Sequence, residues 1–187
     1  MTARLEPLTI ADWDAIPYDE CNRYEIIEGE LFVSCSPGLT HQIVTSNFIF
    51  LIKTFLESNP IGEVIPTPGL VLSNTSGVIP DVVVFLNEQR KTIVTGERLT
   101  GPPALVIEIL SPGAANLRRD RMVKLNLYAK HRVPEYWIVD PKNLSLERYV
   151  LRESSLELLE TLAGEDHLTT DALPGFSCLM SRVFKRI

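Results

Sequence analysis

The sequence predicts an α/β fold in which a mixed central β-sheet is flanked by helices, with an N-terminal β-hairpin and additional antiparallel strands. Three observations predict it. Segments with apolar residues three and four apart alternate with short apolar runs, which indicates helices alternating with strands. Residues 104–110 are almost continuously apolar, which is typical of a strand buried on both faces. Residues 144–151 and 155–162 alternate apolar and polar side chains, as an antiparallel pair does. The length of 187 residues suits one domain, so we assign residues 1–187 to it.

The N-terminal third is expected to contain two helices and a hairpin. A short helix is predicted after Thr9, because Asp12 lies three residues further on and resembles the acidic partner of a capping box. Residues 23–34 predict two strands joined at residues 28–29, where a glycine follows a glutamate. Apolar residues at helical spacing predict a long helix over residues 40–57, with its first threonine as the N-cap.

The remaining elements follow from the same patterns. In chain order we expect extended segments over 61–74, one strand over 78–86, a polar loop with a short helix over 87–101, a strand over 104–110, a helix over 116–131, a buried strand over 135–139, the antiparallel pair, a turn over 172–176 and a last short helix.

The net charge bounds the ways in which this protein can bind nucleic acid. A formal charge of −6 argues against a protein held mainly by neutralising phosphates, because such proteins are usually basic. Binding would then require a local basic patch or a metal ion. One candidate patch lies in the helix predicted over residues 116–131 and consists of Arg118, Arg119, Arg121 and Lys124. The alternative is that these side chains form an ordinary solvated helix face.

The sequence contains neither the apolar run of a signal peptide or membrane helix nor the cysteine spacing of a zinc site or disulfide framework. No apolar run approaches the roughly 18 residues that indicate a membrane-spanning helix, and the N-terminus, M-T-A-R-L-E-P-L-T, lacks the apolar core of a signal peptide. We therefore expect a cytoplasmic protein with no membrane partner. Cys21, Cys35 and Cys178 lie far apart without CxxC spacing, which argues against a zinc cluster or a disulfide framework.

Glu108 is the first residue to examine for chemistry. It interrupts the apolar run of residues 104–110, and a charge inside a buried strand is costly unless it is paired or binds a metal. The alternative is a strand edge, where Glu108 would face water or pair with an arginine.

Asp81 is a second carboxylate next to an apolar run. It follows Pro80 and precedes V-V-V-F, so its side chain can lie at the end of a strand and face a cleft. The alternative is a turn residue, since aspartate beside proline is common in turns.

Lys124 lies four residues after Asp120 and four before Tyr128, so the three side chains share one face of a helix. Taken alone, this spacing favours a surface salt bridge between Asp120 and Lys124. We expect Tyr128 to be a core residue or a hydrogen-bond partner, and Asp120 to orient Lys124.

Taken together, these residues indicate metal-dependent phosphate chemistry. Two carboxylates on neighbouring strands can hold Mg²⁺, with water and phosphate as further ligands. Such an ion lowers the pKa of a bound water and offsets charge in the transition state, and a nearby lysine can orient the water or stabilise the same charge. The chain has no G-x-S-x-G, Walker loop or G-x-G-x-x-G in the required strand-to-helix context.

Several motifs in this order resemble one family. They are Y-E-I-I-E-G-E-L, S-P-G-x-x-H-Q, P-D-V-V-V-F, V-I-E-I-L-S-P, the D-x3-K-x3-Y helix and V-P-E-Y-W-I-V-D-P. Together they are similar to the Uma-two family of endonucleases, within the PD-(D/E)XK or restriction-endonuclease-like superfamily. The resemblance extends from about Leu8 to Phe184.

The resemblance implies a restriction-endonuclease-like core with a metal-dependent phosphodiesterase site. Asp81 matches the motif aspartate and Glu108 the second acidic residue, which implies that both are Mg²⁺ ligands. The superfamily usually places its lysine two residues after that glutamate, where this chain has Leu110. In this family a lysine of the following helix takes its place, and Lys124 matches it, which makes Lys124 a catalytic candidate.

Three further residues are candidates for supporting roles. Glu28, beside the hairpin glycine, could reach the metal site, although an exposed turn is the alternative. His41 and Gln42 fall on the first turn of the helix predicted over residues 40–57 and could contact a phosphate or a metal-bound water. The alternative for His41 is a contact that caps the helix.

We therefore expect a Mg²⁺-dependent endonuclease, with Mn²⁺ as a substitute ion, that cleaves nucleic acid and acts on DNA. A homodimer is expected from the family and from the apolar content of 45%. The acidic net charge and Leu110 leave open a different class, a nucleic-acid-binding or regulatory dimer that keeps the nuclease fold with weak or no catalysis. A third class is an interaction module in which the acidic residues are structural.

Overall fold

A computed structural model describes residues 6–17 and 19–187. Its central sheet has the strand order β12-β11-β10-β9-β6-β3. The strands are β3 (Gly62–Pro66), β6 (Val82–Leu86), β9 (Leu105–Ile109), β10 (Glu135–Asp140), β11 (Ser145–Arg152) and β12 (Ser155–Ala163). The sheet is mixed, because β9 and β10 are parallel while the other neighbouring strands are antiparallel. Parallel neighbours need a crossover, and one helical segment supplies it: α4 (Ala114–Arg118), η1 (Arg119–Lys124) and α5 (Leu125–Lys130).

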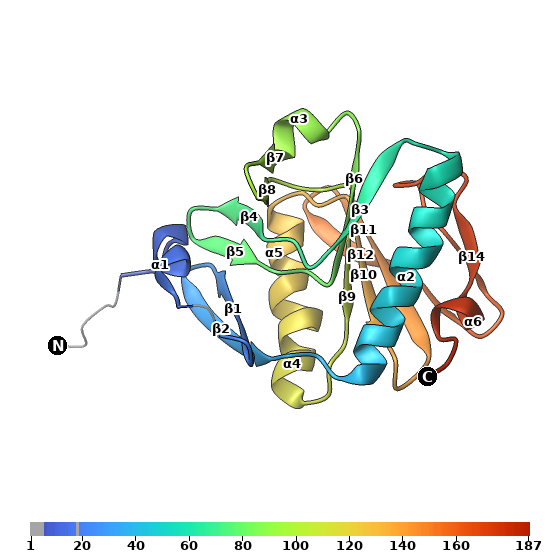
Figure 1. The fold of residues 1–187 in the computed structure, drawn as a ribbon, viewed down its shortest axis with the longest axis horizontal. Coiled ribbons are helices and arrows are strands. Elements are labelled where there is room, and N and C mark those ends of the chain that lie inside the picture. Colours follow the sequence, from blue (N-terminus) through green and yellow to red (C-terminus); the bar gives the residue numbers. More distant parts are fainter. Residues whose placement is uncertain (1–5, 18) are drawn as a thin grey trace.

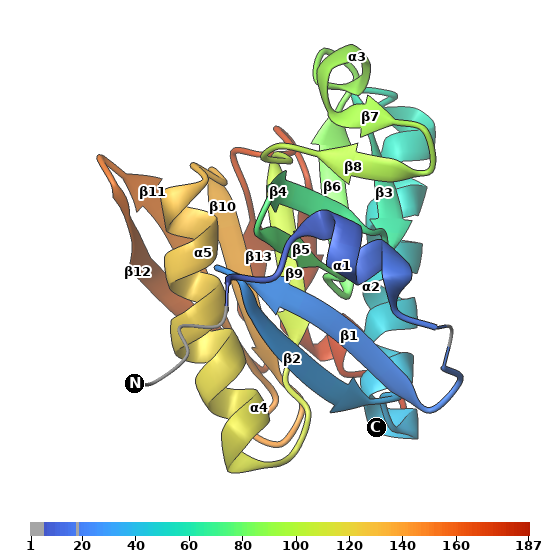
Figure 2. The same ribbon diagram turned by 90° about the vertical axis from the view of Figure 1, so that its left-hand side faces the viewer.

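A second sheet contains the N-terminal hairpin and has the order β2-β1-β5-β4-β8-β7. Its strands are β1 (Asn22–Ile27), β2 (Glu30–Cys35), β4 (Leu70–Ser73), β5 (Ser76–Val78), β7 (Val94–Thr95) and β8 (Arg98–Thr100), with α3 (Arg90–Ile93) before β7. Figure 2 shows α1 (Ile10–Ala15) lying over this sheet. Trp13 of α1 donates its indole N–H to the carbonyl of Tyr24, 2.8 Å away. A Cβ atom at Gly77 would lie 2.4 Å from the Trp13 ring, so glycine is required for this close packing.

The central sheet is covered on both faces. On one face α2 (Leu39–Ser58) packs Val44 and Phe48 against Val82 and Ile107. On the other face, Tyr128 of α5 packs with the neighbouring strand positions, among them Val83 and Val106. Figure 1 shows α2 and α5 on opposite sides of the central strands, with β13 (His167–Thr169), β14 (Ser177–Leu179) and α6 (Met180–Val183) on the α2 side. Burial on both faces explains why β9 is almost continuously apolar in sequence.

Most of the predicted elements are confirmed, including the mixed α/β architecture. The hairpin turns at residues 28–29, where Glu28 and Gly29 both have positive φ, as a two-residue hairpin turn requires. The antiparallel pair is β11 and β12. Asp12 accepts a hydrogen bond from the backbone N–H of Thr9 at 2.7 Å, as the capping box predicted. Within the described residues, none of the helices is long and apolar enough to cross a membrane.

Four predictions about elements were wrong. The segment 78–86 is two strands, because β5 ends in the N-terminal sheet at Val78 and β6 begins in the central sheet at Val82. Residues 87–101 add β7 and β8 to their short helix. The extended segments expected over residues 61–74 are confirmed as β3 and β4, which belong to different sheets. The long helix α2 begins at Leu39 with Gly38 as its N-cap, so threonine 40 lies inside it. The predicted helix over 116–131 begins at residue 114 and contains a π-helical segment.

Candidate active site

Asp81 and Glu108 occupy facing positions on two antiparallel strands. Val82 of β6 pairs with Ile107 of β9, so the next facing positions are Asp81 and Glu108. Facing residues of an antiparallel pair point to the same side of a sheet, here the side of Val83. Both side chains are almost completely buried and line a small cavity of about 30 Å³.

Three groups fix the Asp81 carboxylate. Its Oδ2 accepts the backbone N–H of Ile109 at 2.9 Å and lies 2.9 Å from Nε2 of His41. Its Oδ1 accepts a hydrogen bond from Nη1 of Arg23 at 3.1 Å. Burial alone would raise the pKa of Asp81, but the hydrogen bond and charge of His41, the Ile109 N–H and the charge of Lys124 outweigh it and lower the pKa. Asp81 is therefore an ionised carboxylate at neutral pH.

Glu108 has the opposite electrostatic character. Its Oε1 accepts hydrogen bonds from Nζ of Lys124 and from the hydroxyl of Tyr128, both at 2.8 Å. Burial raises the pKa of Glu108 to about 8, and the negative charges of Asp81, Asp120 and Glu25 add to the effect of burial against the ammonium of Lys124. Like charges that share a site titrate as a unit, so Glu108 carries the proton while Asp81 stays ionised.

Lys124 reaches the cavity from the helical segment. The residue is 1% exposed, and its ammonium lies 2.8 Å from Glu108 and 2.9 Å from Oε1 of Glu25. Burial alone would lower the pKa of Lys124, but the carboxylates of Glu108, Glu25 and Asp120 outweigh burial and raise it. Lys124 is therefore a permanent cation, placed between the carboxyl groups of Glu25 and Glu108.

The helix that carries Lys124 is a π-helix over Arg119–Lys124. π-helical turns are rare and occur frequently at functional sites. Asp120 is buried here, but its carboxylate pairs with Nε of Arg119 at 2.9 Å, so no hydrogen bond joins it to Lys124. The expected contact between Asp120 and Lys124 was wrong, because in the folded chain Lys124 points to Glu108 and Glu25.

Glu25 belongs to the site although the sequence reasoning did not select it. It is 2% exposed on β1, and its Oε1 accepts the backbone N–H of Ile79 at 2.8 Å in addition to its contact with Lys124. A signal was present in Y-E-I-I, a carboxylate within an apolar run, which is the signal that selected Glu108. Arg23 and Arg119 also line the small cavity.

Two of the supporting candidates lie outside this cavity. Glu28 is in the exposed hairpin turn, where its carboxylate pairs with Lys130 and accepts a hydrogen bond from Ser76. Gln42 is exposed and is not among the residues that line the cavity. His41 does line it, because the first turn of α2 brings its ring against Asp81.

The basic cluster of residues 118–124 is largely neutralised by carboxylates. Arg119 pairs with Asp120, and Lys124 is buried between Glu108 and Glu25. The other two members are Arg121, which pairs with Glu147 at 2.6 Å, and Arg118, which is exposed. The cluster is neither a free basic patch nor a uniformly solvated helix face.

The side chains of the site have the chemistry that Mg²⁺ prefers. Mg²⁺ is commonly bound by one or two carboxylates, with water and phosphate oxygens completing its coordination. Asp81, Glu108 and Glu25 supply such oxygens. Burial and, after it, repulsion from the other carboxylates raise the pKa of Glu108, and a bound cation would favour its ionised form instead. No group of three or more His, Cys, Asp or Glu side chains is preassembled as a metal cage within residues 6–17 and 19–187. The residues therefore fit an ion that is shared with a substrate phosphate better than a closed structural site.

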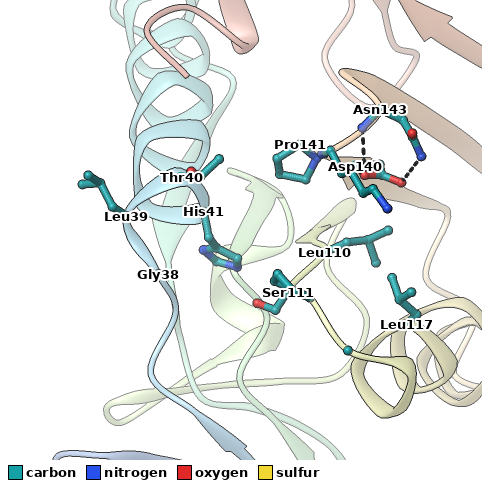
Figure 3. A pocket seen from close by; sticks show the side chains of 13 residues that line it. Gly38, Leu39, Thr40, His41, Leu110, Ser111, Leu117, Asp140, Pro141 and Asn143 are labelled. Atoms are coloured by element: carbon teal, nitrogen blue, oxygen red, sulfur yellow. Dashed lines mark hydrogen bonds between the residues drawn. The ribbon is translucent and has the colours of Figure 1, made fainter.

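A second, larger cavity of about 570 Å³ adjoins the first. Figure 3 shows its lining side chains, which come from the start of α2, from the loop after β9, from α4, and from the end of β10 with the loop that follows it. His41 and Ser111 line both cavities.

Comparisons with known proteins agree with this fold. A crystal structure of a "putative nuclease belonging to DUF820" from Anabaena variabilis ATCC 29413 superimposes with a TM-score of 0.75 at 17% identity, covering 95% of this chain and 98% of that one. At that identity the likeness shows the fold alone. No curated protein matches the sequence. The model of the Uma2 family, described as "Putative restriction endonuclease", matches residues 11–181. Since this match covers far more than half of the chain, the protein belongs to the Uma2 family of restriction-endonuclease-like nucleases.

Proposed function

We propose that this protein is a Mg²⁺-dependent endonuclease that hydrolyses phosphodiester bonds of nucleic acid, with DNA as its substrate and Mn²⁺ as a substitute ion. One observation carries the proposal. Asp81 and Glu108 face each other across two strands, and the Lys124 ammonium lies 2.8 Å from Glu108 in the same cavity. The family description supports a nuclease, and its wording as a restriction endonuclease supports DNA.

In this proposal the carboxylates bind the ion, Lys124 donates a hydrogen bond to an anionic oxygen, and His41 keeps Asp81 ionised. Asp81 and Glu108 would bind Mg²⁺, with Glu25 close enough to Lys124 to fix its position. A bound Mg²⁺ supplies neutralisation of phosphate charge and a lowered pKa of water. The raised pKa of Lys124 keeps it protonated, so it would act as a hydrogen-bond donor to an anionic oxygen and would not act as a general base. His41 and the Ile109 N–H hold Asp81 in the ionised form that an ion requires.

Cleavage of plasmid DNA with Mg²⁺ or Mn²⁺ tests the proposal. Asp81→Asn and Glu108→Gln keep the shape of each side chain and remove its ability to bind an ion as a carboxylate, so each should reduce cleavage by at least about 100-fold. Glu28→Gln is the matched control, since this carboxylate is exposed and lies outside the cavity, and it should leave cleavage unchanged. Wild-type rates in the Asp81 and Glu108 variants would refute the assigned roles.

One observation favours a second function, a nucleic-acid-binding or regulatory homodimer with weak or no catalysis. Protein cations already occupy both carboxylates, since Arg23 contacts Asp81 and Lys124 contacts Glu108. Such internal pairing can neutralise the carboxylates without a metal ion. Nucleic-acid binding without turnover at every metal concentration tried would support this function, and nicking that depends on the metal would exclude it.

A further inference from the structure

The larger cavity beside the candidate active site has no role in the proposed hydrolysis. Its volume of about 570 Å³ lies within the roughly 300–1,000 Å³ of pockets that hold small organic ligands. A phosphate group and a metal ion need only the carboxylate site, so a space of this size calls for a larger group.

The two cavities share two of their lining residues. His41 lines both, and its ring contacts Asp81 at 2.9 Å. Ser111 also lines both, two residues after Ile109, whose N–H binds the same carboxylate. A ligand in the larger cavity would therefore lie against His41, whose ring contacts the proposed metal ligand Asp81.

The walls of the larger cavity are mainly apolar, with a few polar groups. The apolar side chains are Leu39, Leu110, Pro112, Leu117 and Pro141. Among the polar ones, Asp140 is already satisfied: its carboxylate accepts the backbone N–H groups of Lys142 and Asn143 and the side-chain amide of Asn143, as Figure 3 shows for the side chain. The side-chain oxygen of Asn143, the hydroxyls of Thr40 and Ser111 and the ammonium of Lys142 remain to contact a ligand edge. Apolar walls with a few polar groups suit a planar ring with hydrogen bonds at its edge, which describes a nucleobase.

The paired cations of residues 118–124 argue against a substrate held along its backbone by this segment. Arg119, Arg121 and Lys124 are paired with carboxylates, which leaves Arg118 as the exposed member of that cluster without an ion pair among the described residues. A protein that binds a duplex through phosphates needs many free cations. A pocket that binds a base would therefore supply affinity that contacts with the phosphates of the nucleic acid do not provide.

We propose that the larger cavity binds an unpaired nucleobase next to the scissile phosphate. The substrate class is then single-stranded nucleic acid, or a duplex with an unpaired base at the cleavage position. This inference rests on the proposed function and specifies the substrate of the same site.

Fluorescence of an oligonucleotide that carries one 2-aminopurine base tests the pocket without any need for turnover. The probe is offered to the wild-type protein with Ca²⁺, either as a single strand or in a fully paired duplex. The single strand should bind at least about 10-fold more tightly than the duplex, a difference that corresponds to about 1.4 kcal/mol. Its fluorescence should also change when the base leaves the stack.

Leu117→Glu tests the location. It places a carboxylate on the wall of the cavity, whereas Leu158→Glu makes the same change at an exposed leucine of β12 outside both cavities. Repulsion of phosphates would weaken both probes equally, but loss of a base pocket weakens only the unpaired one. The ratio of the two affinities should therefore fall to about 1 in Leu117→Glu and stay at the wild-type value in Leu158→Glu.

The outcomes separate this inference from the function on which it rests. Equal affinity for paired and unpaired probes, or an unchanged ratio in Leu117→Glu, would overturn the base pocket even when plasmid cleavage is observed. Failure to bind either probe, together with failure to cleave plasmid DNA, would overturn the proposed function and the pocket with it.

Discussion

The surroundings of Glu108 favour its ionised form in one respect and its protonated form in another. Its neighbours Lys124 and Tyr128 donate hydrogen bonds that suit a carboxylate, while burial and nearby carboxylates raise its pKa to about 8. A cation at this position would settle the conflict by favouring the ionised form. The protonation of Glu108 is therefore the residue property most sensitive to pH and to metal ions.

This property predicts how stability depends on pH without a metal ion. The pKa of Glu108 is raised in the folded protein from its ordinary 4.5 to about 8, so its contribution to the free energy of unfolding is complete below pH 4.5 and is lost as pH rises through about 8. Between these values, stability should fall by up to about 1.4 kcal/mol per pH unit, the limit for one proton. Glu108→Gln should remove that slope, as urea denaturation at several pH values would measure.

Mg²⁺ should act in the opposite direction, because it binds the ionised carboxylate and releases the proton. Its stabilising effect on the wild-type protein should grow as pH approaches about 8, and Glu108→Gln should lack this effect. If the free energy of unfolding changes with pH in the same way in the wild type and in Glu108→Gln, then Glu108 does not titrate in that range.

The charges of the site were only partly predictable from the sequence. A carboxylate inside an apolar strand singled out Glu108, and a carboxylate at a strand start singled out Asp81. Glu25 carries the same signal, but its place in the site depends on the pairing of β1 with β5. It also depends on contacts with Ile79, which is 54 positions away in the chain, and with Lys124, which is 99 positions away. No local pattern contains such contacts.

At the scale of elements, the π-helix η1 sets the direction of Lys124. A π-helical turn contains one more residue than an α-helical turn, and in an α-helix each residue turns by about 100°. Apolar spacing in the sequence predicted a regular helix, because no local pattern marks where a helix takes up the extra residue of a π turn. The π segment is stabilised by the buried contacts of Asp120 and Lys124, which are tertiary and so do not appear in local propensity.

Deleting Met122 tests this role of η1. Met122 is 57% exposed within the π segment, so its loss should leave a regular α-helix in which Lys124 is turned by about 100° relative to the residues before the deletion. Cleavage should fall at least about 100-fold, and stability should fall by roughly 3 kcal/mol because Glu108 and Glu25 lose their cation. Nuclease assays and thermal unfolding measure the two effects.

Met122→Ala is the control, since it keeps the number of residues and should keep both cleavage and stability near the wild-type values. Full activity in the deletion variant would show that the π turn does not position Lys124.

The division of residues 78–86 between two sheets also exceeded local information. Pro80 lacks a backbone N–H and marks an interruption, which the sequence showed. That the chain leaves one sheet at Val78 and joins another at Val82 depends on pairing with β1 and β9, which lie far away in sequence. The resemblance to a known family compensated for this, since it implied the whole core where single elements could not.

At the scale of the whole molecule, charge limits how nucleic acid can be bound. The chain carries 18 Lys and Arg against 24 Asp and Glu, and the cations of the α4–η1 segment are mostly paired. This segment can then neutralise few phosphates on binding, so little of the affinity from its contacts should come from released counterions.

The dependence of nucleic-acid affinity on salt concentration measures the number of neutralised phosphates. The slope of log K against log salt is about −0.7 per neutralised phosphate for a single strand, so two or three contacts predict a slope no steeper than about −2. Fluorescence anisotropy between about 50 and about 200 mM salt gives the value. Arg118→Ala should make the slope shallower by about 0.7 if this exposed arginine contacts a phosphate. A slope steeper than about −5 would reveal an extensive basic surface that the paired charges do not suggest.

The path of residues 79–81 between the sheets also has a mechanical consequence. Ile79 donates its N–H to Glu25 of the N-terminal sheet, and two residues later Asp81 accepts the N–H of Ile109 in the central sheet. The site thus lies on the seam where the two sheets join, and its ligands exist as a set only while the seam is closed. Any ion or substrate bound there would favour the closed arrangement by mass action. Binding at the site should then slow the local opening of β1 and β5, although these strands belong to the N-terminal sheet and not to the central sheet.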